Sequence, residues 1–172
     1  FEQVLGLAWL PSGRDLIVAG LRPGEARRLY RIDLADGRVS PISQEGVGLP
    51  SAFTGQLRVS PDGRRIAAVD ESNRLVVVTL DDGRAQVVPG VEAPELPLGW
   101  TEDSRGIFVY TPQTLPSRVF IVDAATGRRT LWREVTPRDR SGVTGIYNFV
   151  IAPDAKSWFY SFQRVRSELY LV

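Results

Sequence analysis

The residues whose type and spacing favour binding chemistry are five arginines near the C-terminal end of the chain, Arg133, Arg138, Arg140, Arg164 and Arg166. A guanidinium group is planar and always charged, and it can bind carboxylate or phosphate groups through paired hydrogen bonds. Together these groups could form a site for an anion or an acidic peptide. The alternative is that Glu134, Asp139 and Glu168 pair with them in solvent, where each pair contributes about 0–1 kcal/mol.

The chain contains no histidine and no cysteine. This composition excludes Ser-His-Asp and Cys-His catalysis within the 172 residues, together with zinc sites that depend on histidine or thiolate. The sequence also lacks a G-x-S-x-G turn and a Walker lysine. Carboxylates remain, and they need a close pair in a cleft. We therefore expect no catalytic residue, no cofactor and no metal ion in this segment.

Four aspartates fall in short turns, at Asp62, Asp82, Asp103 and Asp154. Aspartate at such positions is typical of turns in which the carboxylate accepts a hydrogen bond from the backbone two residues on. The run Asp70–Asn73 lacks the D-x-[DN]-x-[DN]-G spacing of a calcium loop. We interpret all of these residues as parts of turns and links rather than as metal ligands.

The overall charge favours no broad class of partner. With 21 Lys+Arg and 20 Asp+Glu, the net charge is +1, so no global field attracts nucleic acid or an anionic membrane. The arginines are not interleaved with aromatic residues that could stack on bases. No window approaches about 18 uninterrupted apolar residues, so we expect no membrane insertion. The expected partner is a protein or a small ligand recognised locally.

A repeated unit dominates the rest of the chain, and its best copy is Leu57–Arg84. This copy contains two successive strand-turn-strand patterns, with Asp-Gly pairs that suit the positive φ angles of tight hairpins. The first turn of each copy falls near positions 13, 63, 104 and 155, which gives intervals of 50, 41 and 51 residues. Such periods are typical of the blades of a β-propeller.

The strands IAAV, LVVVTL, IFVY and FIV are apolar at consecutive positions, so both of their faces must be covered. The sequence therefore predicts an all-β propeller segment of about four blades, each a four-stranded antiparallel meander. The blades cover approximately residues 5–50, 51–97, 98–145 and 146–172, and the last is incomplete. We expect the segment to belong to a larger ring, closed by further blades of its own propeller.

Meander geometry sorts the connections into two faces, because links after odd and even strands emerge at opposite ends. The tight turns define one end, here called the turn face. The other end, here called the long-loop face, contains the links at residues 21–27, 70–73, 111–117 and 163–167 inside blades, and 43–55, 89–97 and 133–145 between blades. Long polar loops on a rigid scaffold are common binding sites. We predict that the partner binds there and that the five arginines contribute.

The stretch Ser60-Pro61-Asp62-Gly63-Arg64-Arg65-Ile66-Ala67, with Leu75–Arg84 after it, resembles the repeat of TolB-type propellers, also called WD40-like or PD40 repeats. The other copies match in part. This resemblance implies a propeller fold, and the same repeat occurs in stand-alone periplasmic TolB-like scaffolds and in the propellers of prolyl-oligopeptidase-like serine peptidases.

The last stretch, IAPDAKSWFYSFQRVRSELYLV, resembles the closing repeat of propellers that follow the kinase domain in some bacterial serine/threonine protein kinases. It implies a sensor or recognition module attached to a kinase, with an extracytoplasmic position favoured over a cytoplasmic one. The kinase motifs themselves are absent from these residues. A kinase domain upstream would support this interpretation, and a hydrolase domain downstream would support the peptidase alternative.

Several aromatic residues have two interpretations. Trp9, Trp100 and Trp158 lie in expected strands and are predicted to pack between blades. Phe53 and Tyr147 flank links between blades, where we expect core packing rather than ligand contact.

Overall fold

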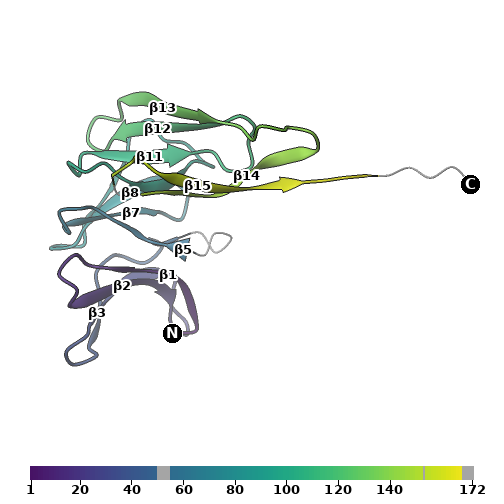
Figure 1. Cartoon of the computed structure of the whole chain (residues 1–172). Coiled ribbons are helices and arrows are strands. Elements are labelled where there is room, and N and C mark those ends of the chain that lie inside the picture. Colours follow the sequence, from purple (N-terminus) through teal and green to yellow (C-terminus); the bar gives the residue numbers. More distant parts are fainter. Residues whose placement is uncertain (50–54, 153, 168–172) are drawn as a thin grey trace, which may run out of the picture.

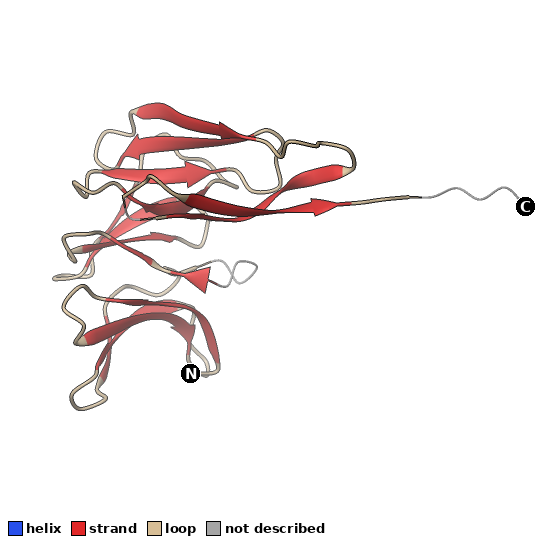
Figure 2. Cartoon of the chain, in the orientation of Figure 1, coloured by secondary structure: helices blue, strands red, loops and turns tan. Residues whose placement is uncertain are grey.

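The computed structural model describes residues 1–49, 55–152 and 154–167. These residues form strands joined by turns and links, and they contain no helix (Figure 2). None of the described segments could therefore cross a membrane as a long apolar helix. The all-β fold class predicted from the sequence is confirmed.

The strands form four sheets that follow one another along the described chain, here called blades 1 to 4 (Figure 1). Blades 1 and 2 contain β1 (Gln3–Trp9), β2 (Asp15–Leu21), β3 (Arg28–Asp33), β4 (Val39–Pro41), β6 (Arg58–Val59), β7 (Arg65–Val69), β8 (Leu75–Thr79) and β9 (Ala85–Val87). Blades 3 and 4 contain β10 (Leu96–Trp100), β11 (Gly106–Tyr110), β12 (Ser117–Asp123), β13 (Arg129–Val135), β14 (Val143–Ile151) and β15 (Trp158–Arg164). Each strand pairs antiparallel with the next one in its blade, as a meander requires.

One pairing departs from the predicted antiparallel meander. The short strand β5 (Gly55–Gln56) pairs in parallel with β1. The direction follows from the topology, because the link between blades 1 and 2 belongs to the long-loop face. The first strand of each blade therefore starts at that face and runs toward the turn face. The first strands of neighbouring blades therefore run the same way.

The described sheets do not close into a ring, so blades 1 and 4 are the two ends of the stack of blades. In the described residues, blade 4 consists of β14 and β15 alone. The predicted third strand of this blade, at residues 168–172, lies outside the described residues. The described sheets therefore have the open arrangement expected from the sequence.

Burial on both faces of the strands explains why the blades stack. Every residue of β11 is buried, and so are four of the five residues in both β7 and β8. The buried apolar side chains of the described residues form three clusters, one between each pair of successive blades. Representative members are Leu29 and Ile66, then Val77 and Ile107, then Phe108 and Ile146. Each sheet face thus loses its contact with water against the next blade, which is the main source of stability.

Tight turns hold the strands in register at the turn face. Gly83 has φ +69°, and a Cβ atom at this position would lie 2.2 Å from the carbonyl oxygen of Ile42 in the preceding blade. Only glycine satisfies both the backbone conformation and this close approach. The turn aspartates accept backbone hydrogen bonds as predicted, for example from Arg64 to Asp62 and from Arg84 to Asp82, both at 3.0 Å.

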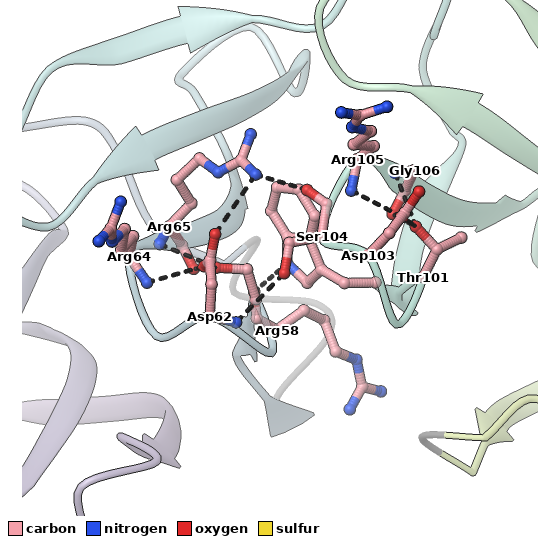
Figure 3. Close-up of polar contacts among 11 residues, drawn as sticks. Arg58, Asp62, Arg64, Arg65, Thr101, Asp103, Ser104, Arg105 and Gly106 are labelled. Carbon is pink, nitrogen blue, oxygen red and sulfur yellow. Dashed lines mark hydrogen bonds and ion pairs between the residues drawn. The ribbon is translucent and has the colours of Figure 1, made fainter.

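A polar cluster joins the turns of blades 2 and 3 (Figure 3). The backbone N–H of Asp62 donates to Oγ of Ser104 at 3.1 Å, and the guanidinium of Arg65 donates to the carbonyl of Ser104. In addition, the indole N–H of Trp100 donates to the carbonyl of Arg58 at 2.7 Å, while Arg65 lies over the indole ring. Turn residues of one blade thereby fix the position of the next blade.

Replacing Ser104 with alanine tests this inter-blade cluster. The change removes the acceptor for the Asp62 N–H and keeps a side chain at the same positive φ, so we expect a loss of about 1–2 kcal/mol in the free energy of unfolding. Urea unfolding at constant protein concentration measures it. Ser12→Ala, in the exposed turn of blade 1, is the control and should cost less than about 0.5 kcal/mol. Equal effects of the two substitutions would contradict the role of Ser104.

A second interaction makes the stability depend on pH. Both carboxylate oxygens of Asp15 accept hydrogen bonds from the Arg31 guanidinium at 2.8 Å, and the Asp15 side chain is only 9% exposed. These bonds hold the pKa of Asp15 below its ordinary value of 3.8, despite the opposing effect of burial. A lowered pKa in the folded state stabilises the fold above the unfolded pKa, and this contribution is lost as the pH falls through the folded pKa.

We therefore expect the free energy of unfolding to decrease as the pH falls below about 4, with Asp15 contributing about 1 kcal/mol of the change. Asp15→Asn should be less stable at neutral pH and should show a shallower dependence in this acid range. Urea unfolding of both proteins between neutral and acid pH makes the comparison. Parallel pH profiles would show that the Asp15–Arg31 pair does not contribute.

Candidate functional site

The links of the long-loop face are tied to one another by hydrogen bonds. In blades 1 and 2, Nε of Arg27 donates to the carbonyl of Gly46 at 3.1 Å, and Nη2 of the same side chain donates to the carbonyl of Asp70. One arginine thus joins three links that are far apart in the sequence. In blade 3 the N–H of Gln113 donates to the carbonyl of Ile146 in blade 4 at 2.9 Å. The long-loop face therefore presents links whose positions are fixed across blades.

The link between β13 and β14 contains two of the predicted arginines, Arg138 and Arg140, and both residues are exposed. The link has a defined conformation, because the N–H of Ser141 donates to Oδ1 of Asp139 at 2.9 Å. Its far end is held by the N–H of Val165, which donates to the carbonyl of Gly142 at 2.8 Å. The two arginines are therefore displayed from an ordered link that contacts the end of blade 4.

Arg164 is the blade 4 partner of this link. Its Nη1 atom lies 2.9 Å from Oδ2 of Asp139, and Nη2 donates to the Asp139 carbonyl, also at 2.9 Å. Hydrogen bonds from Ser141, assisted by the charge of Arg164, lower the pKa of Asp139. The structure therefore brings Arg164 to the link that contains Arg138 and Arg140. Arg166, two residues further on, is exposed.

The predicted neutralisation by carboxylates holds for one pair only among the described residues. Asp139 pairs with Arg164, whereas Glu134 lies 3.0 Å from Arg118 in blade 3. Glu168 lies outside the described residues. Of the predicted carboxylate partners, Asp139 therefore pairs with Arg164, and no ion pair within the described residues neutralises Arg138 or Arg140.

Two of the five arginines do not lie on links, contrary to the prediction. Arg133 is inside β13, which continues to the buried Val135 instead of ending near Trp132. Its guanidinium lies over the rings of Trp132 and Trp158, at 5.1 and 4.1 Å from their centroids. Arg164 is the last residue of β15. Because β13 is the outer strand of blade 3 and has one side in water, it tolerates a charged residue, so the charge of Arg133 did not indicate where the strand ends.

A shallow pocket of about 400 Å³ adjoins the link at residues 111–117. It is lined by Thr111, Thr114, Pro116, Arg118 and Phe120. This volume lies within the range of small-ligand pockets, about 300–1,000 Å³. The long-loop face of blade 3 therefore contains a hollow beside its polar links.

One partly buried arginine was not predicted from the sequence to have a role. Arg58 lies in β6, and burial lowers the pKa of its guanidinium. Its side chain points away from the turn cluster of Asp62 and Ser104 (Figure 3). The feature of the sequence that could have indicated this residue is a charge between the apolar residues Leu57 and Val59.

The expected aromatic positions divide into three groups. Trp100 and Trp158 pack in the clusters between blades, as predicted. Trp9 is 58% exposed, because no described blade precedes blade 1, so its packing between blades stays a prediction. The hydroxyl of Tyr147 donates to Oε1 of Gln163 at 3.2 Å, at the exposed side of blade 4 rather than in the core. Phe53 lies outside the described residues.

The described residues contain no group of three or more acidic, histidine or cysteine side chains placed to hold a metal ion. The turn aspartates are instead occupied with backbone donors, such as the N–H groups of Arg105 for Asp103 and of Lys156 for Asp154, both at 3.0 Å. Asp70 likewise accepts hydrogen bonds from Ser72 and Arg74 at 2.9 Å. Their interpretation as turn and link residues is confirmed.

No protein-family model and no curated protein matches the chain. Solved structures do match its fold. TolB from Acinetobacter baumannii superposes with a TM-score of 0.66 at 13% identity, over 95% of this chain and 41% of that one. An oligogalacturonate lyase from Vibrio parahaemolyticus gives a TM-score of 0.62 at 17% identity, over 92% of this chain and 45% of the lyase.

The β-propeller domain of Cps50 from Myceliophteria thermophila gives a TM-score of 0.60 at 17% identity, over 94% of this chain and 49% of that one. At such identities the likeness concerns the fold alone. This chain spans about half the length of each of the three structures. The sheets described above and these superpositions together show that the chain is a segment with a TolB-like β-propeller fold.

Proposed function

We propose that this segment is a non-catalytic recognition module that binds an anionic protein surface or small ligand on its long-loop face. The observation that carries the proposal is the ordered link at residues 136–142, which displays Arg138 and Arg140 beside the end of β15. Arg166 adds a further exposed cation close by in the sequence.

The electrostatics of the link favour this role. The carboxylate of Asp139 accepts a hydrogen bond from Ser141 and pairs with Arg164 of blade 4, so its negative charge is neutralised by Arg164. Arg138 and Arg140 on either side of it remain exposed to a partner. Because hydrogen bonds already fix the backbone of the link, binding would cost little additional ordering of the chain.

The wider setting that we propose is a bacterial receptor-type serine/threonine protein kinase, with this segment as the C-terminal sensor on the extracytoplasmic side. The support is the resemblance of the stretch from Ile151 to Val172 to the closing repeat of such propellers. The sequence of the full open reading frame is the test. A kinase domain upstream is expected, whereas a downstream hydrolase domain would replace this setting with that of a peptidase propeller.

The binding proposal is tested with the double variant Arg138→Ala/Arg140→Ala and a fluorescent decaglutamate peptide as the probe. We expect the variant to bind the peptide about tenfold more weakly, a loss of about 1.4 kcal/mol. Fluorescence anisotropy measures the affinity, and added salt should weaken binding by the wild-type chain more than binding by the variant. Thermal stability should be almost unchanged, because both residues are exposed.

The matched control is Arg64→Ala/Arg84→Ala, which removes the same charge from exposed positions on the turn face. It should bind the peptide nearly as well as the wild-type chain. Equal losses in the two double variants would reduce the effect to overall charge, and unchanged binding by Arg138→Ala/Arg140→Ala would rule out the arginine link as the site.

A further inference from the structure

Both ends of the link at residues 136–142 are anchored to the blades. Pro137 is buried at its start. At its far end Gly142 has φ +70°, and a Cβ atom there would lie 2.2 Å from the carbonyl oxygen of Val165, just after β15. Glycine therefore allows this close approach, and the Val165 N–H donates to the Gly142 carbonyl at 2.8 Å. The exposed residues 138–141 lie between these two anchors.

Asp139 holds the middle of the exposed stretch through three contacts. Its Oδ1 atom accepts a hydrogen bond from the N–H of Ser141 at 2.9 Å. Its Oδ2 atom lies 2.9 Å from Nη1 of Arg164, and its carbonyl oxygen accepts a hydrogen bond from Nη2 of Arg164, also at 2.9 Å. One acidic residue thus ties the backbone between Arg138 and Arg140 to the end of β15.

The contact between Asp139 and Arg164 differs from an ordinary surface ion pair. Exposed pairs contribute little, because water screens the charges and two long side chains must be ordered. Here the Arg164 side chain is only 24% exposed, and its guanidinium binds both the carboxylate and the backbone carbonyl of the same residue. The Asp139 carboxylate is also held by Ser141. The contact therefore restrains the backbone of the link as well as balancing charge.

A carboxylate between two arginines is unfavourable for anion binding if charge alone is considered. Residues 138–140 carry two positive charges and one negative charge. Removing the negative charge would raise the local potential, so the affinity for an anion would increase. The contacts of Asp139 lead to the opposite expectation, because its loss would release the backbone that displays Arg138 and Arg140.

We infer that Asp139 and Arg164 form a latch that holds Arg138 and Arg140 in position for an anionic partner, so that an acidic residue is required for anion binding. The inference rests on the function proposed above and adds two positioning residues to it. The latch orders the link before the partner arrives, so less chain freedom is lost on binding.

Asp139→Ala tests the latch, because charge and position predict opposite results. We expect the variant to bind the fluorescent decaglutamate peptide about fivefold more weakly than the wild-type chain, measured by anisotropy at one salt concentration. The matched control is Glu134→Ala, which removes the same charge from an exposed residue of β13 that pairs with Arg118. It should bind the peptide at least as tightly as the wild-type chain.

The double variant Asp139→Ala/Arg164→Gln separates the two explanations a second time. It removes one charge of each sign, so the net charge of the chain stays +1. If charge alone decides the affinity, the two effects oppose each other and binding returns close to the wild-type value. With the latch, the double variant should remain about fivefold or more weaker than the wild-type chain.

Hydrogen exchange at the Val165 amide reports on the latch without a ligand. This N–H donates to the Gly142 carbonyl rather than to Asp139, so its protection measures how firmly the link is held against blade 4. In NMR spectra we expect its exchange to be about fivefold faster in Asp139→Ala and unchanged in Glu134→Ala. Circular dichroism verifies that the variants are folded.

The possible failures are distinct. Tighter or unchanged peptide binding by Asp139→Ala would overturn the latch at any exchange rate and would leave Arg138 and Arg140 as the proposed site. Weaker binding with unchanged exchange at Val165 would also overturn it, because the link would not have moved. Absence of peptide binding by the wild-type chain would instead overturn the proposed function, and the role of the latch in binding with it.

Discussion

A sheet that is apolar on both faces must be covered on both sides, and the rest of this structure depends on that requirement. In β11 all five residues are buried, which a meander with one wet face cannot provide. Stacking of successive blades is the solution, and each stacking step produces one apolar cluster. The hydrophobic effect is not directional, however, so it does not by itself fix how one blade sits on the next.

Polar contacts at the turn face and at the long-loop face fix the orientation of each blade relative to the next. At the turn face, Ser104 accepts from the Asp62 backbone while Trp100 donates to Arg58. At the long-loop face, Arg27 bridges links of blades 1 and 2, and Arg164 joins the link after β13 to the end of β15. Backbone groups that cannot pair within a blade are thus satisfied by the neighbouring blade, and this fixes the rotation between sheets.

The sequence was sufficient to predict the fold, because local signals there agree with one another. Asp-Gly turns, apolar runs of strand length and a regular spacing all indicate the same blade, and residues 65–69 and 75–79 form strands as expected. Prediction of the site was less complete. Arg133 belongs to an outer strand, where a charged residue is tolerated, so composition could not distinguish strand from link. The contacts of Arg164 with Asp139 depend on how two blades meet, which no local pattern records.

The two ends of the stack and the candidate binding face are physically connected. Blade 4 provides Arg164 and Arg166, yet among the described residues it is a two-stranded sheet with one face exposed at Phe159. Two-stranded sheets have little stability of their own, so the end of β15 depends on its contacts with the link at residues 136–142 as well as on its pairing with β14. A blade packed on the exposed face would restrain β15 from its second side. The geometry of the arginine link therefore depends on how the end of the stack is covered.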